Sequence, residues 1–219
     1  MGIDKGLCGL KTMKVVKMNT THFQIFWNKR YPKSVPIGHH LRKDYPDQWF
    51  RIHSLPESKR YADNEDERKI LLDRHNALMT DLIGHHAEFI LVTGRYYYPD
   101  PEIFQIEKEY REFECFQKMN LHESDAINLF ESYPGYYDAE PEVYFVPASI
   151  ETIWTPGEFD DLLINIADGE TSAVFLGVTR NVVVCPYDGG VDCIVENFNQ
   201  VAFYKDKYRD WLSRLESGL

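Results

Sequence analysis

Three short apolar runs near the C-terminus, separated by turn sequences, restrict the fold of this chain more than any other feature. The runs cover residues 172–179, 182–187 and 191–197, and they are joined by Arg180–Asn181 and by a loop built on Asp188 and two glycines. Connections this short join antiparallel strands, because a parallel pair needs a crossover of a dozen or more residues. The pattern therefore predicts a three-stranded antiparallel meander.

Other strands and helices are indicated by hydrophobic periodicity and by capping residues. Strands are expected at residues 48–54, 87–94 and 143–149. Helices are expected at residues 22–31, from about 36 to before Pro46, and at 65–83, 157–168 and 198–215, with Thr21, Asn64 and Thr155 as N-caps and Gly84 as a stop. Because helices and antiparallel strands come in separate groups, the expected fold class is α+β, an antiparallel sheet packed against several helices. We expect a loose leader at residues 1–20 and a single domain at residues 21–219.

Composition and cysteine spacing favour a cytoplasmic protein. The chain is 43% apolar and 14% aromatic, and no run approaches the roughly 20 apolar residues that span a bilayer. Its four cysteines, at positions 8, 115, 185 and 193, lack zinc-ligand spacing, so neither a metal nor a cofactor is expected. Cys185 and Cys193 either form a disulfide across the hairpin or are reduced thiols that pack as small hydrophobic residues, and we favour reduced thiols.

The charge distribution points to a basic protein partner. The net charge is −11, but residues 1–60 carry 12 Lys/Arg and 4 Asp/Glu, a net charge of +8, whereas residues 61–219 carry 12 and 31, a net charge of −19. Such an acidic field repels nucleic acid and accelerates association with a cationic partner. A solvated acidic surface without a partner is the plainer alternative for any single acidic run.

The favoured hypothesis is a protein-binding module, specifically a cytoplasmic immunity-type inhibitor of a basic toxin or nuclease domain. Aromatic residues interleaved with acids suit an interface in which charge steers the partner. The expected contact surface consists of Tyr96, Tyr97, Tyr98, Glu107, Glu109, Tyr136, Tyr137, Asp138 and Glu140.

The alternative is a small-ligand-binding or hydrolytic protein that uses the segment His53–Arg60 together with Asp188 and Asp192. The two acids flank glycines, which favours a hairpin turn over a Mg²⁺ or Ca²⁺ site. No nucleophile elbow, dinucleotide fingerprint or phosphate loop is present, so an enzyme is the less favoured reading. The alternative gains support if residues 49–54 and 187–192 converge on one pocket. Its candidate residues are Arg51, His53, Ser54, Lys59, Arg60, Asp188 and Asp192.

Two other candidate sites have simpler structural explanations. Basic residues of 51–60 beside Trp49, Phe50 and Tyr61 resemble a platform for single-stranded nucleic acid. Because the rest of the chain is so acidic, we favour internal pairing of Arg51 or Arg60 with carboxylates instead. The adjacent histidine pairs at 39–40 and 85–86 lack the spacing that places two metal ligands on one face.

Three segments resemble a family of bacterial proteins of about this length that carries a domain-of-unknown-function label. They are RIHSLPESKRYADN at residues 51–64, PYDGGVD at residues 186–192 and RDWLSRLESGL at residues 209–219. The family pattern has an HSLP(E/G)SKRY segment, a PYDGGxD hairpin and a C-terminal DWLS motif. The resemblance covers landmarks from about residue 50 to the C-terminus. It implies membership of the family and does not imply an activity, a cofactor or a partner.

Overall fold

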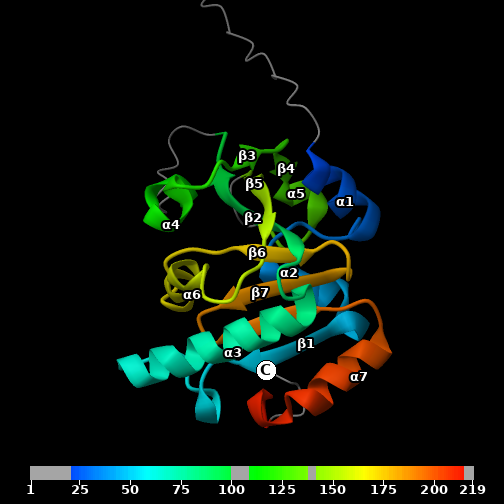
Figure 1. The fold of residues 1–219 in the computed structure, drawn as a ribbon. Coiled ribbons are helices and arrows are strands. Elements are labelled where there is room, and N and C mark those ends of the chain that lie inside the picture. The colour runs from blue at the N-terminus through cyan, green and yellow to red at the C-terminus, as the bar shows by residue number, and fades with distance from the viewer. Residues whose placement is uncertain (1–20, 100–108, 138–141, 215–219) are drawn as a thin grey trace, which may run out of the picture.

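The fold is α+β and is built on one antiparallel sheet. A computed structural model describes residues 21–99, 109–137 and 142–214. Within these ranges, eight strands form one sheet in the order β1-β8-β7-β6-β2-β5-β3, and β4 pairs with β5 beside β3. Figure 1 shows α3 crossing in front of the strands, with α6 beside it and α7 below. The expected leader at residues 1–20 lies outside the described residues.

The strands are β1 (Trp49–His53), β2 (Glu88–Tyr97), β3 (His122–Glu123), β4 (Ile127–Asn128), β5 (Tyr144–Ile153), β6 (Val174–Gly177), β7 (Val182–Tyr187) and β8 (Gly190–Ile194). The α-helices are α1 (His22–Arg30), α2 (Gly38–Asp44), α3 (Glu65–Ile83), α4 (Glu114–Gln117), α5 (Leu129–Ser132), α6 (Asp160–Ala167) and α7 (Phe198–Lys207). Short 3-10 turns include η3 (Tyr110–Glu112) and η4 (Arg209–Trp211).

Alternation along the strands gives the sheet two apolar faces. On β2, Phe89 and Leu91 belong to the core beneath α3 and α6, whereas Ile90 and Val92 belong to the core beneath α1 and α2. Successive strand residues point to opposite faces, so each strand contributes side chains to both cores. The central strands are therefore continuously apolar, because helices cover both faces of the sheet.

Local capping explains where several helices begin and end. Thr21 and Gln24 form a reciprocal capping box at the start of α1, as the sequence predicts. The Asn64 side chain accepts a hydrogen bond from the backbone N–H of Glu67 at the start of α3. This helix ends at Gly84, whose φ of +111° favours glycine. The acidic residues 65–67 lie in the first turn of α3 and therefore have a structural role at the positive end of a helix.

Several boundaries differ from the sequence prediction, and β5, for example, extends to Ile153, four residues beyond the expected end. The helix expected from residue 157 begins at Asp160, because Gly157 has a φ of +90° and interrupts the first turn, so Thr155 is not its N-cap. The C-terminal helix ends at Lys207 and is followed by the 3-10 turn η4. Between β6 and β7, four residues rather than two form the connection, because the last pair of the ladder joins Gly177 to Val182.

Cys185 and Cys193 are free thiols rather than a disulfide. Cys185 lies opposite Asp192 and Cys193 lies opposite Val184, so the two thiols stand on opposite faces of the sheet. Burial raises the pKa of both thiols, which keeps them protonated.

Every helix in the described ranges is too short or too polar to cross a membrane.

Candidate functional site

Arg51 and Asp192 form a buried ion pair on the α2 side of the sheet. They lie directly opposite each other on β1 and β8. The guanidinium Nε and Nη2 donate to the two Asp192 oxygens at 2.7 and 2.9 Å, and Trp49 Nε1 donates to Oδ1 at 2.8 Å. Only 12% of the Arg51 side chain and 8% of the Asp192 side chain are exposed. Both carboxylate oxygens are therefore occupied by groups of the protein itself.

The remaining basic residues of this segment are also paired within the chain. Arg60 donates to Asp188 Oδ2 through Nη2 at 2.5 Å, and the Tyr61 hydroxyl donates to the same oxygen at 2.9 Å. Lys59 reaches Glu67 at 2.5 Å, and its hydrogen bond lowers the pKa of that carboxyl. The hairpin and the β1 segment therefore converge, as the ligand alternative requires, but their charges neutralise one another. This arrangement confirms the prediction of internal pairing for Arg51 and Arg60.

Ser54 and His75 are sealed inside the protein. Ser54 Oγ and His75 Nε2 are 2.8 Å apart, and both side chains are fully buried. His75 Nδ1 and His53 Nε2 are buried without a hydrogen-bond partner among the described residues. Burial lowers the pKa of His75 to about 3, so its imidazole is neutral. A nucleophile has to contact its substrate, so this serine–histidine pair cannot act hydrolytically in the observed conformation.

Four of the expected contact tyrosines gather around α2 and α5. Tyr96, Tyr98 and Tyr137 pack against a small apolar core, which makes them partly structural. The Tyr137 hydroxyl lies 2.8 Å from His40 Nε2, and 51% of Tyr136 is exposed.

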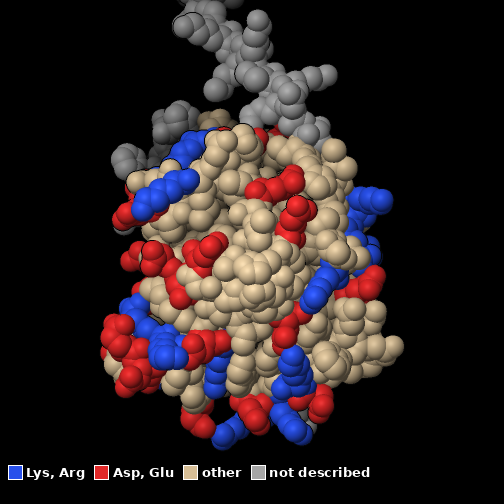
Figure 2. All heavy atoms as spheres, in the orientation of Figure 1, with Lys and Arg blue, Asp and Glu red and all other residues tan. Residues whose placement is uncertain are grey.

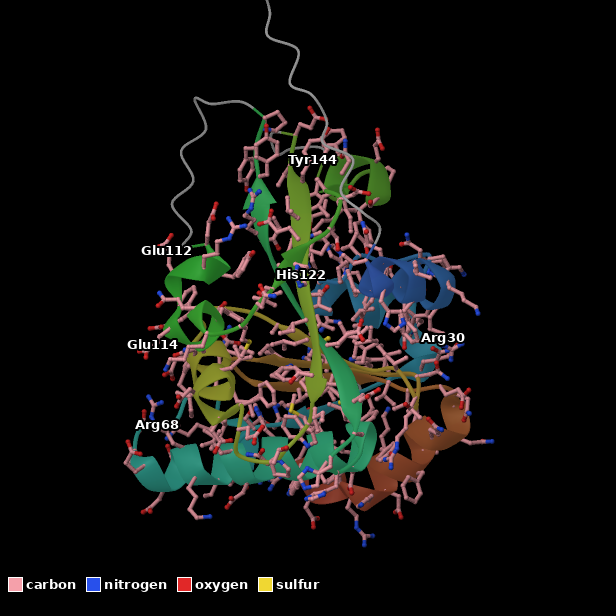
Figure 3. The ribbon with its side chains drawn as sticks, turned by 45° about the horizontal axis from the view of Figure 1, so that its top comes forward. Arg30, Arg68, Glu112, Glu114, His122 and Tyr144 are labelled. Atoms are coloured by element: carbon pink, nitrogen blue, oxygen red, sulfur yellow. The ribbon has the colours of Figure 1, made fainter. Side chains whose placement is uncertain are left out.

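The rest of the expected contact surface does not join them. Tyr97 is on the opposite side of β2 from its neighbours, with its ring 6.1 Å from that of Tyr144, the first residue of β5, which is labelled in Figure 3. Glu109 lies beside Arg111, its Oε2 3.7 Å from Nη1. Glu107, Asp138 and Glu140 lie outside the described residues. The described tyrosines and acids of the expected surface therefore occupy two sides of the sheet.

A groove between α4 and α6 collects acidic residues that the sequence reasoning did not bring together. Its volume is about 790 Å³, and Phe113, Phe159 and Leu162 lie at its base, each at least 93% buried. Figure 2 shows acidic side chains over this side of the molecule, and Figure 3 shows Glu112 and Glu114 at its edge. We call this feature the acidic groove, and its charged residues are Glu112, Glu114, Lys118, Glu158, Asp161 and Glu170.

The acids of the groove differ from those of the hairpin in their pairing. Lys118 pairs with Glu114 at 3.3 Å, and both side chains are more than 80% exposed. Within the part of the chain that the structure describes, no basic side chain forms an ion pair with Glu158, Asp161 or Glu170. The groove therefore holds excess negative charge over an apolar base. Its acids come from segments about 45 residues apart, so only the sheet topology reveals that they share a site.

No group of three or more His, Cys, Asp or Glu in the described ranges is arranged to hold a metal ion.

Comparison with known proteins gives a family without a described activity. Neither a curated protein nor a solved structure matches this chain. A family model described as "Domain of unknown function (DUF3885)" matches residues 37–216, which is most of the chain. The match includes β1, the hairpin of β7 and β8, and both walls of the acidic groove. The chain therefore belongs to the DUF3885 family of domains of unknown function.

Proposed function

We propose that this protein binds a basic protein partner through the acidic groove, in the manner of an immunity-type inhibitor of a cationic toxin or nuclease domain. One observation carries the proposal: several carboxylates without an internal cation surround an exposed depression with an apolar base. Asp188 and Asp192, by contrast, each pair with an arginine of the chain.

A cationic partner would account for this cluster of acidic side chains. Clustered like charges repel one another and lower the stability of the folded chain. A cationic partner relieves that repulsion and is attracted from a distance. Phe113 and Phe159 are each only 7% exposed, so they shape the floor of the groove and the charged rim would make most of the contact. Nucleic acid fits poorly, because its phosphates carry the same sign of charge.

The cytoplasmic location remains a prediction. It is consistent with the two free thiols of the hairpin, which reducing compartments maintain. The hydrolytic alternative is not favoured, because its serine is buried and its basic residues are paired with internal carboxylates.

Neutralising the groove is expected to weaken partner capture with little effect on the stability of the fold. The groove variant carries Glu112→Gln, Glu158→Gln, Asp161→Asn and Glu170→Gln, which raises the net charge from −11 to −7. Immobilised wild type and variant are compared for proteins retained from the host lysate at low and high salt. We expect a basic protein that the wild type retains at low salt and that the variant binds at least about tenfold more weakly, a loss of about 1.4 kcal/mol. Relief of the repulsion and loss of the Asp161 carboxylate from the first turn of α6 oppose each other, so unfolding stability should change by no more than about 1 kcal/mol.

A matched-charge variant separates the effect of the groove on partner binding from the effect of net charge. It carries Asp47→Asn, Asp125→Asn, Glu196→Gln and Asp206→Asn, four exposed acids outside the groove. It has the same net charge as the groove variant and should retain the partner as the wild type does. Equal losses of partner binding in the two variants would mean that the interaction depends only on the net charge of the protein. Undiminished capture by the groove variant would refute the proposed site.

A further inference from the structure

A second concave site lies on the opposite face of the sheet from the acidic groove. Its volume is about 330 Å³, and its base is formed by Val92, Val174 and Cys185. These residues belong to the core beneath α1 and α2, whereas Phe113 and Phe159 of the groove belong to the core on the other face. We call it the α2-side pocket.

One wall of the α2-side pocket is the Arg51–Asp192 pair. The guanidinium Cζ lies 4.6 Å from the ring centre of Tyr187, which also lines the pocket. Arg51 uses Nε and Nη2 to bind Asp192, so Nη1 takes no part in that pairing. The pair is rigid, because strand pairing, two charge-assisted hydrogen bonds and the Trp49 indole hold it. It therefore presents a fixed polar edge beside an apolar base.

The charge of the lining selects the class of ligand. Arg51 and Asp192 are the oppositely charged residues that line the pocket, and they cancel each other. A phosphate or another multiply charged anion would meet the Asp192 carboxylate, and the lining itself adds no cation besides the paired Arg51, although Arg42 lies close enough to act on Tyr187. An uncharged molecule would escape this repulsion and would still find hydrogen-bonding groups on Arg51 and on His39 at the rim. Electrostatics therefore disfavours the anionic ligands that an arginine usually attracts.

Aromatic rings make up much of the remaining wall. Tyr96, Phe145 and Tyr187 line the pocket together with the His39 imidazole. Rings at this density favour stacking or edge contacts with another ring. We propose that the α2-side pocket binds a small, uncharged aromatic molecule, with its apolar part against Val92 and Val174 and a hydrogen-bonding edge toward Arg51. The volume is at the lower end of the range for ligand sites, which fits a molecule of one or two rings.

Ligand-observed and protein-observed NMR test this site directly. The full chain is titrated with indole, benzamide and adenine as uncharged aromatic probes, and with inorganic phosphate and adenosine monophosphate as anionic probes. We expect at least one uncharged probe to bind with a Kd below about 1 mM, a free energy of about −4 kcal/mol. Amide shift changes should centre on Gly38, His39, Ser172 and Val174. Shift changes confined to the acidic groove would overturn the assignment.

A variant that blocks the entrance of the pocket tests whether the uncharged probe binds there. Ser172 is exposed and lies at the mouth, so Ser172→Trp fills the entrance without disturbing the core. It should weaken binding of the uncharged probe at least about tenfold. Asn199→Trp, on exposed α7, adds the same side chain elsewhere and should leave binding unchanged. Binding that survives Ser172→Trp, or binding of the anionic probes alone, would overturn the proposal.

Discussion

Replacing Asp192 with alanine is expected to lower the free energy of unfolding by about 3–5 kcal/mol. The substitution leaves the Arg51 guanidinium buried without its counter-charge and the Trp49 indole N–H without its acceptor. A buried charge that loses its partner pays its desolvation cost without compensation. Urea denaturation followed by tryptophan fluorescence measures the loss as a lower midpoint at a similar slope.

Asp188→Ala is the matched control in the same hairpin. Its partner Arg60 has 64% of its side chain exposed, so water can replace the lost carboxylate. We expect a loss of no more than about 1 kcal/mol. The double variant Arg51→Met with Asp192→Leu removes both charges and should recover most of the stability that Asp192→Ala loses. Equal losses for the two single alanine variants would show that burial of the Arg51 pair has no special energetic weight.

Acid is expected to destabilise the fold well before the carboxylates are protonated, and His75 is a principal cause. Burial lowers the pKa of His75 in the folded state to about 3, whereas an unfolded histidine titrates near 6.5. Between these values the unfolded chain binds more protons than the folded chain. The contribution of neutral His75 to the free energy of unfolding is therefore fully present above pH 6.5 and is lost as the pH decreases toward 3. The expected slope for one such histidine is about 1.4 kcal/mol per pH unit. His40, whose pKa burial also lowers to about 3, adds to the loss.

Comparing unfolding at pH 7 and pH 5 isolates this contribution. His75→Asn removes the titrating ring and is expected to have a lower stability at pH 7, because the buried contact with Ser54 is altered. Its stability should nevertheless change less between pH 7 and pH 5 than that of the wild type, by about 1–2 kcal/mol. A wild-type slope retained in His75→Asn would contradict the assignment.

Much of the fold could be predicted because the signals are local. The Asn64 cap and the Gly84 stop define α3, and the tight turns of the meander define β6 to β8. The start of α6 could not be predicted in the same way. Pro156 and Glu158 have the composition of a helix N-terminus, but Gly157 adopts a left-handed conformation that only the folded chain reveals.

The candidate site was harder to predict because its residues are distant in the sequence. The pairing of Arg51 with an acid follows from charge balance, but the identity of its partner depends on the register of β1 against β8. The tyrosines from 96 to 98 suggested one continuous surface, yet strand alternation sends Tyr97 to the other side. The acidic groove depends on α4 packing beside α6, which no local pattern encodes.

Amide hydrogen exchange of the protein with and without its captured partner tests the proposed binding site most directly. A partner in the acidic groove should slow exchange in residues 112–119 and 158–170, because it covers both walls and stabilises α4 and α6 against local opening. The opposite face around α2 should exchange at its unbound rate. Protection confined to α2, Tyr136 and Tyr137, with residues 112–119 and 158–170 unchanged, would contradict the groove as the binding site.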